Sequence, residues 1–306
     1  MRLVFAGTPA VAVPTLRLLA SQHEVAAVIT RPDAPLGRKR VLTPSPVAAA
    51  AEERGLEVIK AARLDADVTE RISALAPELG VIVAYGGLVR EPLLSTPEHG
   101  WINLHFSLLP AWRGAAPVQR ALIAGDDVLG ASVFQLVPEL DAGDVYDSRV
   151  IDVPHDATAD VALDALAESG APLTAEVVAS IAAGSASPQP QSGTVTLAPK
   201  LSLSDGLLDF TRPFTEVYAR LRGVTPEPGA HTTVDGARLK ILAAEPASGD
   251  ERPAPGVMTG TKHAVLIGTA TDPLAVTRVQ PAGKPGMAAA DWWRGRREGE
   301  STVAGS

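Results

Sequence analysis

The sequence predicts an α/β protein in two parts, a parallel β-sheet covered by helices and, after it, a small β-barrel. Three observations lead to this fold class. Short apolar strand signals alternate with helix signals over residues 1–183. A stretch rich in Ser, Pro, Gln and Gly follows at 184–203, and such a composition is typical of a linker. Beyond it, short runs with a period of two residues are separated by turn residues, as in small antiparallel barrels.

The first strand and helix are defined by local residue types. The run RLVFAG (2–7) is expected to be a short buried strand that ends at Gly7. A helix is expected over 9–22, with Thr8 as its N-cap and Pro9 at its first position. Proline is tolerated there because the first N–H groups of a helix have no intrahelical partner.

The following elements continue the alternation. In chain order we expect strand 24–30, a long loop 31–45, helix 46–54 capped by Ser45, strand 57–60, helix 65–76, strand 79–85, a helix near 89–95, strand 100–106, a helix ending near 124, strands near 131–137 and 144–153, and helix 158–183. Strands and helices of these lengths form βαβ units with right-handed crossovers, which predicts a parallel sheet.

The composition fits a folded protein of two domains. The chain has 306 residues, of which 46% are hydrophobic and 20% charged, enough for a full apolar core. It has no cysteine, which excludes disulfides and thiolate metal sites and suits a reducing compartment. The first apolar run is broken at Gly7, so we expect no signal peptide. No apolar run approaches the roughly 18 residues of a membrane span, and we expect a cytoplasmic protein without a membrane partner.

Charge is unevenly distributed along the chain. Taken alone, the formal net charge of −8 argues against a nucleic-acid partner. Residues 126–203 hold 12 acids and only two bases, however, whereas 1–125 carry 13 bases and 11 acids and 204–306 carry 12 of each. A cationic surface can therefore form outside the acidic segment. The candidates are the loop 31–40 and, in the last part of the chain, Arg278, Lys284, Arg294, Arg296 and Arg297.

The glycine in FAGTP at 5–9 is a weak candidate for a phosphate site. Gly7 follows a strand and opens a helix, as phosphate-binding turns do. The dinucleotide pattern G-x-G-x-x-G is absent, however, because the next glycine is Gly37. A tight strand-to-helix turn is therefore favoured over a dinucleotide site.

Two polar side chains interrupt the strand expected at 100–106. Asn103 and His105 lie two residues apart, hence on one face, near the carboxyl end where open α/β sheets bind ligands. Downstream, PELDAGDVYD places Asp141 and Asp144 in a Gly-containing loop between two strands. Asn, His and Asp together can stabilise an oxyanion and move a proton. This combination indicates acyl transfer to a substrate that brings its own nucleophile, such as an amine.

Other interpretations of these residues are weaker. A lone histidine is ordinarily a hydrogen-bonded core residue, but an amide at i−2 and an acid downstream favour a functional site. Ser107 is flanked by Phe106 and Leu108, so the nucleophile-elbow pattern G-x-S-x-G is missing. Metal ligation by His105 and Asp141 lacks a third ligand at a sensible spacing, and we expect no metal.

Several motifs together resemble a known family. NLHFSLLPAWRGAAPVQRAL (103–122), followed by LDAGDVY (140–146), resembles the 10-formyltetrahydrofolate-dependent formyltransferases, whose signature is S-L-L-P, three residues and Gly. Within them, the likeness is to the enzymes that formylate methionyl-tRNA. FAGTP (5–9), PLGRKRVLTPSPV (35–47), VIVAYGG (81–87) and QPAGKPGM (280–287) also match, so the resemblance runs nearly end to end.

The resemblance implies roles for individual residues. Asn103, His105 and Asp141 match the catalytic trio of the family, and Arg38 matches a basic residue of the loop that wedges into the acceptor end of initiator tRNA. The residues implied at the folate site are Tyr85, Gly86, Leu88, Ser107, Leu108, Leu109, Pro110 and Asp144. Those implied at the tRNA site are Arg38, Lys39 and Arg40.

The fold that the resemblance implies agrees with the pattern of elements. It is a Rossmann-like formyltransferase domain with a parallel-sheet core at 1–184, a linker at 185–203 and a C-terminal OB-like β-barrel domain at 204–306 that binds tRNA. The implied formyl donor is 10-formyltetrahydrofolate, and the implied partner is initiator tRNA charged with methionine. We expect the protein to be a monomer.

The implied reaction is transfer of the formyl group to the α-amine of methionine esterified to tRNA. Asn103 and a protonated His105 would stabilise the oxyanion, and Asp141 would keep His105 charged and aligned. The sequence departs from the family at Phe106, where Gly or Ala is usual, and at TPEPG (225–229), which lacks a common Trp.

Related activities fit less well. A glycinamide ribonucleotide formyltransferase is usually a single, shorter domain, and a nucleotide-sugar formyltransferase lacks the GRKR loop in this form. A formyltetrahydrofolate hydrolase would carry an N-terminal regulatory domain. An RNA-binding module with a degenerate catalytic half is opposed by the intact trio of Asn103, His105 and Asp141.

Overall fold

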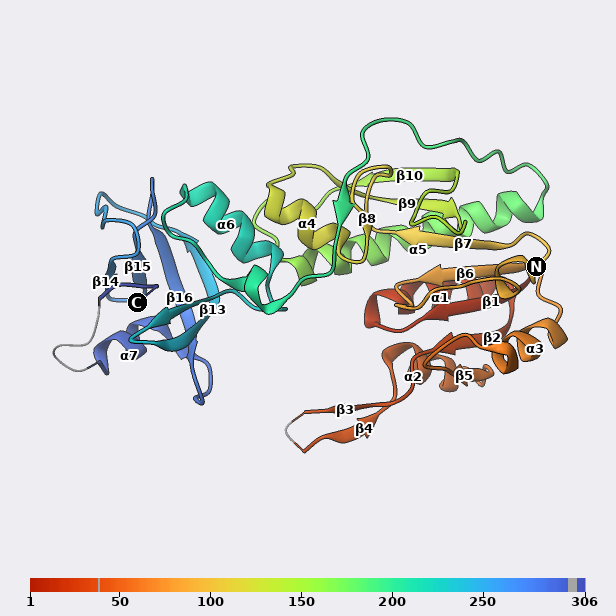
Figure 1. Ribbon diagram of the computed structural model, residues 1–306, viewed down its shortest axis with the longest axis horizontal. Coiled ribbons are helices and arrows are strands. Elements are labelled where there is room, and N and C mark those ends of the chain that lie inside the picture. Colours follow the sequence, from red (N-terminus) through yellow and green to blue (C-terminus); the bar gives the residue numbers. More distant parts are fainter. Residues whose placement is uncertain (38, 297–301, 306) are drawn as a thin grey trace. The chain divides into compact units, whose positions relative to one another are not determined.

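The chain folds into two compact units, shown in Figure 1. The computed structural model describes residues 1–37, 39–296 and 302–305. The first unit consists of Met1–Pro117, Val128–Val153 and Leu163–Ala198, and the second of Val118–Asp127, Pro154–Ala162 and Pro199–Ser306. Within the described residues, no helix is both long and apolar enough to cross a membrane.

The first unit is built on a seven-stranded sheet. Its strands, in spatial order, are β10 (Val145–Ile151), β9 (Leu129–Gln135), β7 (Trp101–His105), β6 (Leu79–Val83), β1 (Arg2–Gly7), β2 (Glu24–Thr30) and β5 (Val58–Lys60). The five strands from β7 to β5 are parallel, which confirms the predicted parallel-sheet core. β9 is antiparallel to both β7 and β10, and β9 and β10 are joined by a loop without a crossover helix.

Along the chain, helices lie between or after the strands of this sheet. They are α1 (Val13–Gln22), α2 (Pro46–Glu52), α3 (Ala66–Ala74), α4 (Pro117–Ala124) and α5 (Ala159–Ala182), with the 3-10 turns η1 (Ala10–Ala12) and η2 (Leu93–Ser95). Two starts are fixed by side-chain caps, since Ser45 accepts from the N–H of Ala48 and Asp65 from that of Val68. The predicted cap at Ser45 is therefore confirmed.

Three local predictions differ from the structure. The helix expected from residue 9 begins with η1, and α1 starts at Val13, so that Pro14 lies in its first turn, where proline is tolerated. The loop expected at 31–45 contains a hairpin of β3 (Ala34–Leu36) and β4 (Val41–Thr43), which projects from the sheet in Figure 1. The helix expected near 89–95 is wrong, because only η2 forms there.

The core of the first unit lies on the central strands. Val4 and Ala6 of β1 and Ile29 of β2 are completely buried. Trp101, at the start of β7, is also completely buried, and its Nε1–H donates to the carbonyl oxygen of Leu93 at 2.9 Å. The start of β7 is therefore fixed in the core. This fixes the position of His105, with which the strand ends.

The Ser- and Pro-rich stretch after α5 is bonded to the first unit as far as residue 198. The backbones of Val145 and Gln189 exchange two hydrogen bonds of 2.8 Å. Further along, β11 (Leu197–Ala198) pairs in parallel with β8 (Arg113–Gly114). A segment whose composition predicts a linker thus adds an ordered covering to the turn that follows β7.

The second unit contains an antiparallel sheet with the order β12 (His231–Val234), β13 (Ala237–Pro246), β16 (Leu274–Pro281), β15 (Val265–Ile267) and β14 (Met258–Gly260), and β17 (Met287–Ala288) pairs with β16. The register shifts within β13 near Ala243, and such irregularities curl a sheet. Buried Val265, Ile267 and Leu274 form part of its core. η3 (Leu203–Gly206), α6 (Phe214–Gly223) and α7 (Ala289–Arg294) accompany it. This curled half-barrel agrees with the predicted OB-like domain.

Candidate active site

The carboxyl end of β7 brings the first two candidate residues into one place. Asn103 and His105 follow the alternation of a strand, so both side chains lie on the same face. β7 is an inner strand, with Asn103 opposite Ile82 of β6 and Phe134 of β9. Because both neighbours are hydrogen-bonded to it, the backbone at the site has little freedom. The structure thus places the amide and the imidazole on a rigid element, as an active site requires.

His105 is held at both ring nitrogens. Nε2 lies 2.9 Å from the carbonyl oxygen of Trp112, and a carbonyl only accepts, so Nε2 carries a proton and donates it. Nδ1 lies 3.9 Å from Oδ2 of Asp141, and the two side chains are only 7% and 13% exposed. The ring also meets Phe134 edge-on, with centroids 6.3 Å apart. With Nε2 occupied, proton exchange is confined to Nδ1, which faces Asp141.

The electrostatics of the ring differ from the sequence-based expectation of a charged imidazole. Burial lowers the pKa of His105 below its ordinary 6.5, while the Asp141 carboxylate and the hydrogen bond to Trp112 act in the opposite direction. At neutral pH the resting ring is therefore neutral, with its electron pair at Nδ1. A neutral ring in this position is a base beside an anion that stabilises its protonated form.

Asp141 is fixed by a backbone donor. Its Oδ2 accepts a hydrogen bond of 2.8 Å from the N–H of Gly114. Gly114 has φ of +130°, and a Cβ there would lie 2.7 Å from the carbonyl oxygen of Ala198, so no other residue fits without a shift. Asp141 itself has φ of 45°, in the left-handed region. The acid is thus held in one orientation through a strained backbone conformation.

Asn103 carries a buried polar atom that the chain leaves unused. Its Oδ1 is shielded from solvent and has no hydrogen-bond partner among the described residues. A buried acceptor without a partner costs about 1–3 kcal/mol. Such a group beside His105 fits a site that a ligand completes, because a bound donor group would satisfy the amide oxygen.

The predicted folate-site residues fall into three places. Tyr85, Gly86 and Leu88 follow β6, next to the end of β7; the Tyr85 hydroxyl donates to the carbonyl oxygen of Ala61, and Leu88 is 67% exposed. The second group, Ser107, Leu108, Leu109 and Pro110, forms the turn directly after His105.

Asp144 is separated from these two groups. It is exposed and lines a hollow of about 490 Å³ together with Glu139, Gly143 and Tyr146, a hollow that does not include the trio.

Ser107 is not arranged as a nucleophile. Its hydroxyl donates to the carbonyl oxygen of Ala111 at 2.6 Å, and its side chain is buried. A serine nucleophile needs a base within hydrogen-bond reach, whereas both ring nitrogens of His105 face other groups. The structure thus gives Ser107 a role in shaping the turn.

The basic residues predicted at the tRNA site lie on two surfaces. Lys39 and Arg40 are exposed between β3 and β4, at the tip of the hairpin; Arg38 lies outside the described residues. Among the basic candidates of the second unit, Arg294 pairs with Asp291 and Arg296 with Asp235, so both are already engaged with acids. Arg297 is also outside the described residues.

Sequence reasoning missed the groups that orient the trio. They are the carbonyl of Trp112, the N–H of Gly114 and two side chains of the expected linker, Gln191 and Thr196. Gly114 is the glycine of the family signature, so the sequence singled it out. The sequence did not indicate that its N–H binds Asp141. The linker composition gave no signal that Gln191 and Thr196 contact the site.

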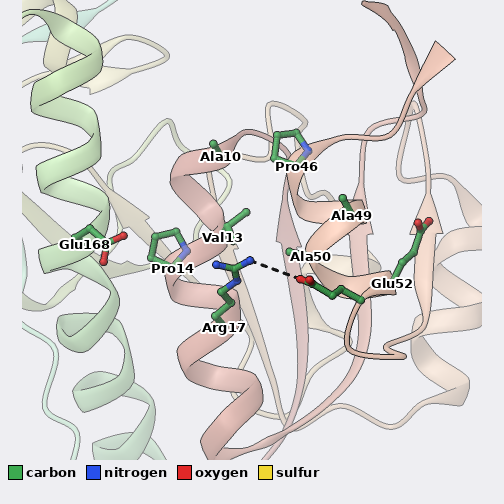
Figure 2. A pocket seen from close by; sticks show the side chains of 10 residues that line it. Ala10, Val13, Pro14, Arg17, Pro46, Ala49, Ala50, Glu52 and Glu168 are labelled. Carbon is green, nitrogen blue, oxygen red and sulfur yellow. Dashed lines mark ion pairs between the residues drawn. The ribbon is translucent and has the colours of Figure 1, made fainter. Parts of the chain in front are cut away.

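A larger hollow lies elsewhere on the first unit, as Figure 2 shows. Its volume is about 720 Å³, and α1, α2 and α5 supply most of its lining. Arg17 forms an ion pair of 3.6 Å with Glu53 across it, and Glu168 lies on the α5 side. Small Ala and Pro side chains make up most of the rest, so the hollow lacks the groups that acyl transfer needs. Over residues 1–37, 39–296 and 302–305, no three His, Asp or Glu side chains gather as a metal site requires.

Fold and site together define an α/β protein in which a parallel sheet carries Asn103 and His105 beside Asp141, followed by an antiparallel β-domain. The family model described as formyl transferase matches residues 1–178, and the model of its C-terminal domain matches 200–297. The chain belongs to the formyl transferase family, as the motifs of the sequence predicted.

Relatives resemble the chain over nearly its whole length. A methionyl-tRNA formyltransferase of Leifsonia xyli subsp. xyli is 62% identical over 295 residues, 96% of this chain and 97% of the relative. Another, of Arthrobacter sp. (strain FB24), is 55% identical over 307 residues, 99% of each.

Among solved structures, the sugar 3N-formyl transferase WlaRD shares the fold, with a TM-score of 0.70 and 14% sequence identity. The match covers 93% of this chain and 99% of that one. A methionyl-tRNA formyltransferase from Clostridium thermocellum also shares the fold (TM-score 0.57, 15% identity, 82% and 95%).

Proposed function

We propose that this protein transfers a formyl group from 10-formyltetrahydrofolate to the α-amino group of methionyl initiator tRNA, which gives N-formylmethionyl-tRNA for translation initiation. The observation that carries the proposal is the likeness of 62% identity over 96% of the chain to a protein named methionyl-tRNA formyltransferase. That likeness covers the N-terminal unit and the C-terminal domain together.

The site suits a carbonyl donor and an amine acceptor. Bound 10-formyltetrahydrofolate would supply the formyl group as an amide carbonyl. Asn103 lies in β7 on the same face as His105, its oxygen has no partner among the described residues, and its amide group can bond the reacting atoms. The turn 107–110 and the residues that follow β6 flank it, and we propose that they bind the donor.

The proton of the amine is taken up by His105. In the neutral ring Nδ1 is the free base, and it accepts the proton that the amine loses as its bond to carbon forms. The imidazolium is stabilised by the Asp141 carboxylate, whose Oδ2 lies 3.9 Å from Nδ1. The proton then passes from Nδ1 to the departing nitrogen. Asn103 donates from its amide to the carbonyl oxygen as negative charge builds there.

The tRNA contacts that we propose are cationic and exposed. Lys39 and Arg40, at the tip of the β3–β4 hairpin, have no acidic partner within ion-pair distance among the described residues. Phosphate contacts by such residues make binding dependent on salt. We assign residues 1–184 to the catalytic domain, 185–203 to the connection and 204–306 to the tRNA-binding domain. A monomer that works in the cytoplasm is consistent with this function.

The test is direct formylation. The purified chain, 10-formyltetrahydrofolate and initiator tRNA charged with methionine should yield N-formylmethionyl-tRNA, detected after deacylation. Glycinamide ribonucleotide and an amino-sugar nucleotide serve as competing acceptors, and His105→Ala serves as the inactive control. Faster formylation of either small amine than of the tRNA would contradict the proposed substrate.

A further inference from the structure

The side chain of Gln191 makes four hydrogen bonds around the candidate site. Its Oε1 accepts from Nε and Nη2 of Arg113, at 3.0 and 2.6 Å. Its Nε2 donates to the carbonyl oxygens of Asp141 and Gly143, both at 2.8 Å. One amide group thus uses both lone pairs of its oxygen and both hydrogens of its nitrogen, the full capacity of the side chain.

These contacts connect the two segments that surround His105, namely residues 112–114 and the loop that carries Asp141. Three consecutive residues act together: Trp112 accepts from Nε2 of His105, Arg113 binds Gln191, and Gly114 donates to the carboxylate of Asp141. Gln191 adds the missing connection, because it joins Arg113 to the backbone that carries Asp141. The His105 ring and the Asp141 carboxylate are therefore held by one connected set of hydrogen bonds.

The Asp141 loop needs such an external restraint. Asp141 has φ of 45°, a left-handed conformation that is uncommon outside glycine, although Asp adopts it more often than most residues. Such conformations persist where surrounding contacts hold them. The two Gln191 bonds reach the carbonyls of residues 141 and 143, on either side of the turn, and so hold this conformation in place.

We infer that Gln191 is a positioning residue: it holds the backbone of residues 141–143 against Arg113 and thereby keeps the Asp141 carboxylate in range of Nδ1 of His105. The inference rests on the proposed function in that formyl transfer is the reaction measured. No other amino acid combines one tip oxygen with two N–H donors at this reach, since asparagine is one methylene shorter and glutamate lacks the donors.

The first test compares Gln191→Ala and Gln191→Glu with the control Gln189→Ala. Gln189 lies in the same segment, but among the described residues its side chain bonds only to Ser187. Gln191→Ala should lower kcat about 10- to 100-fold with KM for donor and tRNA nearly unchanged, because a small misplacement of a catalytic group has effects of that size. Gln191→Glu should be at least as slow, since its oxygens would face the two carbonyls. The control should keep the wild-type kcat.

Folding of these variants is protected by other bonds. The segment remains bound through the backbone pair of Gln189 with Val145, the hydrogen bond from Trp112 N–H to the Thr196 hydroxyl, and the β11–β8 pairing. Thermal melting of each variant checks this. If Gln191 merely anchored the segment through Arg113, Gln191→Glu would behave like wild type, because a carboxylate binds Arg113 at least as well.

Two further measurements report on Asp141 itself. In an Asp141→Asn background, Gln191→Ala should lower kcat no further, as expected when one residue acts through the other. The ring of His105, followed by NMR during a pH titration, should ionise at lower pH in Gln191→Ala than in Gln189→Ala, because the carboxylate that favours its charged form is displaced.

The outcomes separate the two proposals. Wild-type kcat and an unchanged His105 titration in Gln191→Ala would overturn the role of Gln191 even when formyl transfer is observed. Absence of formyl transfer in the wild-type protein would overturn the proposed function, and the NMR titration would still decide whether Gln191 positions Asp141.

Discussion

At the residue scale, the chemistry of the site depends on how the neighbours of His105 divide its two nitrogens. Trp112 and Asp141, which face Nε2 and Nδ1, both adopt positive φ, 61° and 45°. Left-handed conformations of this kind cost of order 1–3 kcal/mol each. The strain places a carbonyl and a carboxylate on opposite sides of one ring, so that only one nitrogen is left to exchange protons.

The pH dependence of formyl transfer should follow from this arrangement. The active form has Nδ1 unprotonated, so kcat/KM should fall as pH decreases through the pKa of His105, which burial places below 6.5. Asp141→Asn removes the charge that raises this pKa and should move the fall to still lower pH, besides slowing the reaction. Rate profiles between about pH 5 and 8 measure this.

Glu139→Gln is the matched control, because Glu139 is an exposed acid of the same loop. Its profile should coincide with that of the wild-type protein. A fall that moves to higher pH in Asp141→Asn would contradict the assignment of Nδ1 as the base.

At the scale of elements, the connection between β9 and β10 is as constrained as the strands themselves. Gly143 is part of this connection, and a Cβ there would be 1.8 Å from the carbonyl oxygen of Gln135. The backbones are that close because the N–H of Gln135 donates to the carbonyl of Asp144 at 2.8 Å. The loop that carries Asp141 is therefore folded tightly against the end of β9.

Gly143→Ala should disrupt this loop. The added methyl group cannot fit without moving backbone, so the Asp141 carboxylate should lose its bond to Gly114 and the rate should fall by at least about 100-fold. Kinetics and thermal melting measure the effect. Gly295→Ala, where a Cβ would meet its nearest atoms at an ordinary 3.6 Å, should be close to wild type. Equal kinetics of the two variants would show that the loop tolerates displacement.

The β3–β4 hairpin is the element that we assign to RNA. Replacing Lys39 and Arg40 together by Ala should raise KM for charged tRNA and reduce its dependence on salt, because fewer counterions are released on binding. Formylation rates across a salt series measure both effects, and the donor affinity should stay constant. Arg54→Ala, an exposed cation that follows α2, provides the control. Unchanged salt dependence in the double variant would remove the hairpin from the RNA site.

Sequence patterns predicted the elements whose signals are local. The buried strands β1, β2, β6 and β7 were predicted correctly because short apolar runs bounded by turn residues are typical of buried strands. The β3–β4 hairpin was missed because its residues are exposed and interrupted by Pro and Gly. No α-helix forms near 89–95, because Pro92 lies inside this range and only the 3-10 turn η2 follows it.

The candidate site shows the same limit. Asn103 and His105 could be predicted because they are polar residues, two positions apart, in an apolar strand. Asp141 could be predicted from the motif LDAGDVY. Gln191 could not, because its role depends on hydrogen bonds to residues 48 to 78 positions earlier in the chain. Such long-range contacts leave no periodic pattern, and the local composition around Gln191 indicated only a linker.

At the scale of the whole molecule, acids and bases are separated along the chain. Most of the excess negative charge is in 126–203, and the second part of the chain is balanced. We propose that donor binding belongs to the first unit, whereas tRNA binding also needs the second. The affinities for the two substrates should therefore change differently when the folding stability of the second unit is lowered.

Leu274→Ala tests this division of roles. Leu274 is completely buried in the half-barrel, and such a truncation costs about 2–5 kcal/mol of unfolding free energy. The variant should show a higher KM for charged tRNA at temperatures where the half-barrel begins to melt. Donor affinity, measured by equilibrium binding, should persist. Parallel loss of both affinities would contradict the division.

The pairing of β11 with β8 also orders events during synthesis. Chains emerge from the ribosome with the N-terminus first. All seven strands of the main sheet are available once residue 151 has been made, yet Gln191, Thr196 and β11 are still to come. The nascent protein can thus assemble its sheet early, while the turn 112–114 and the Asp141 loop lack their bonds to Gln191, Thr196 and β11 until residue 198 has emerged. Folding and catalytic competence are acquired in sequence, separated by the time needed to translate α5 and the segment behind it.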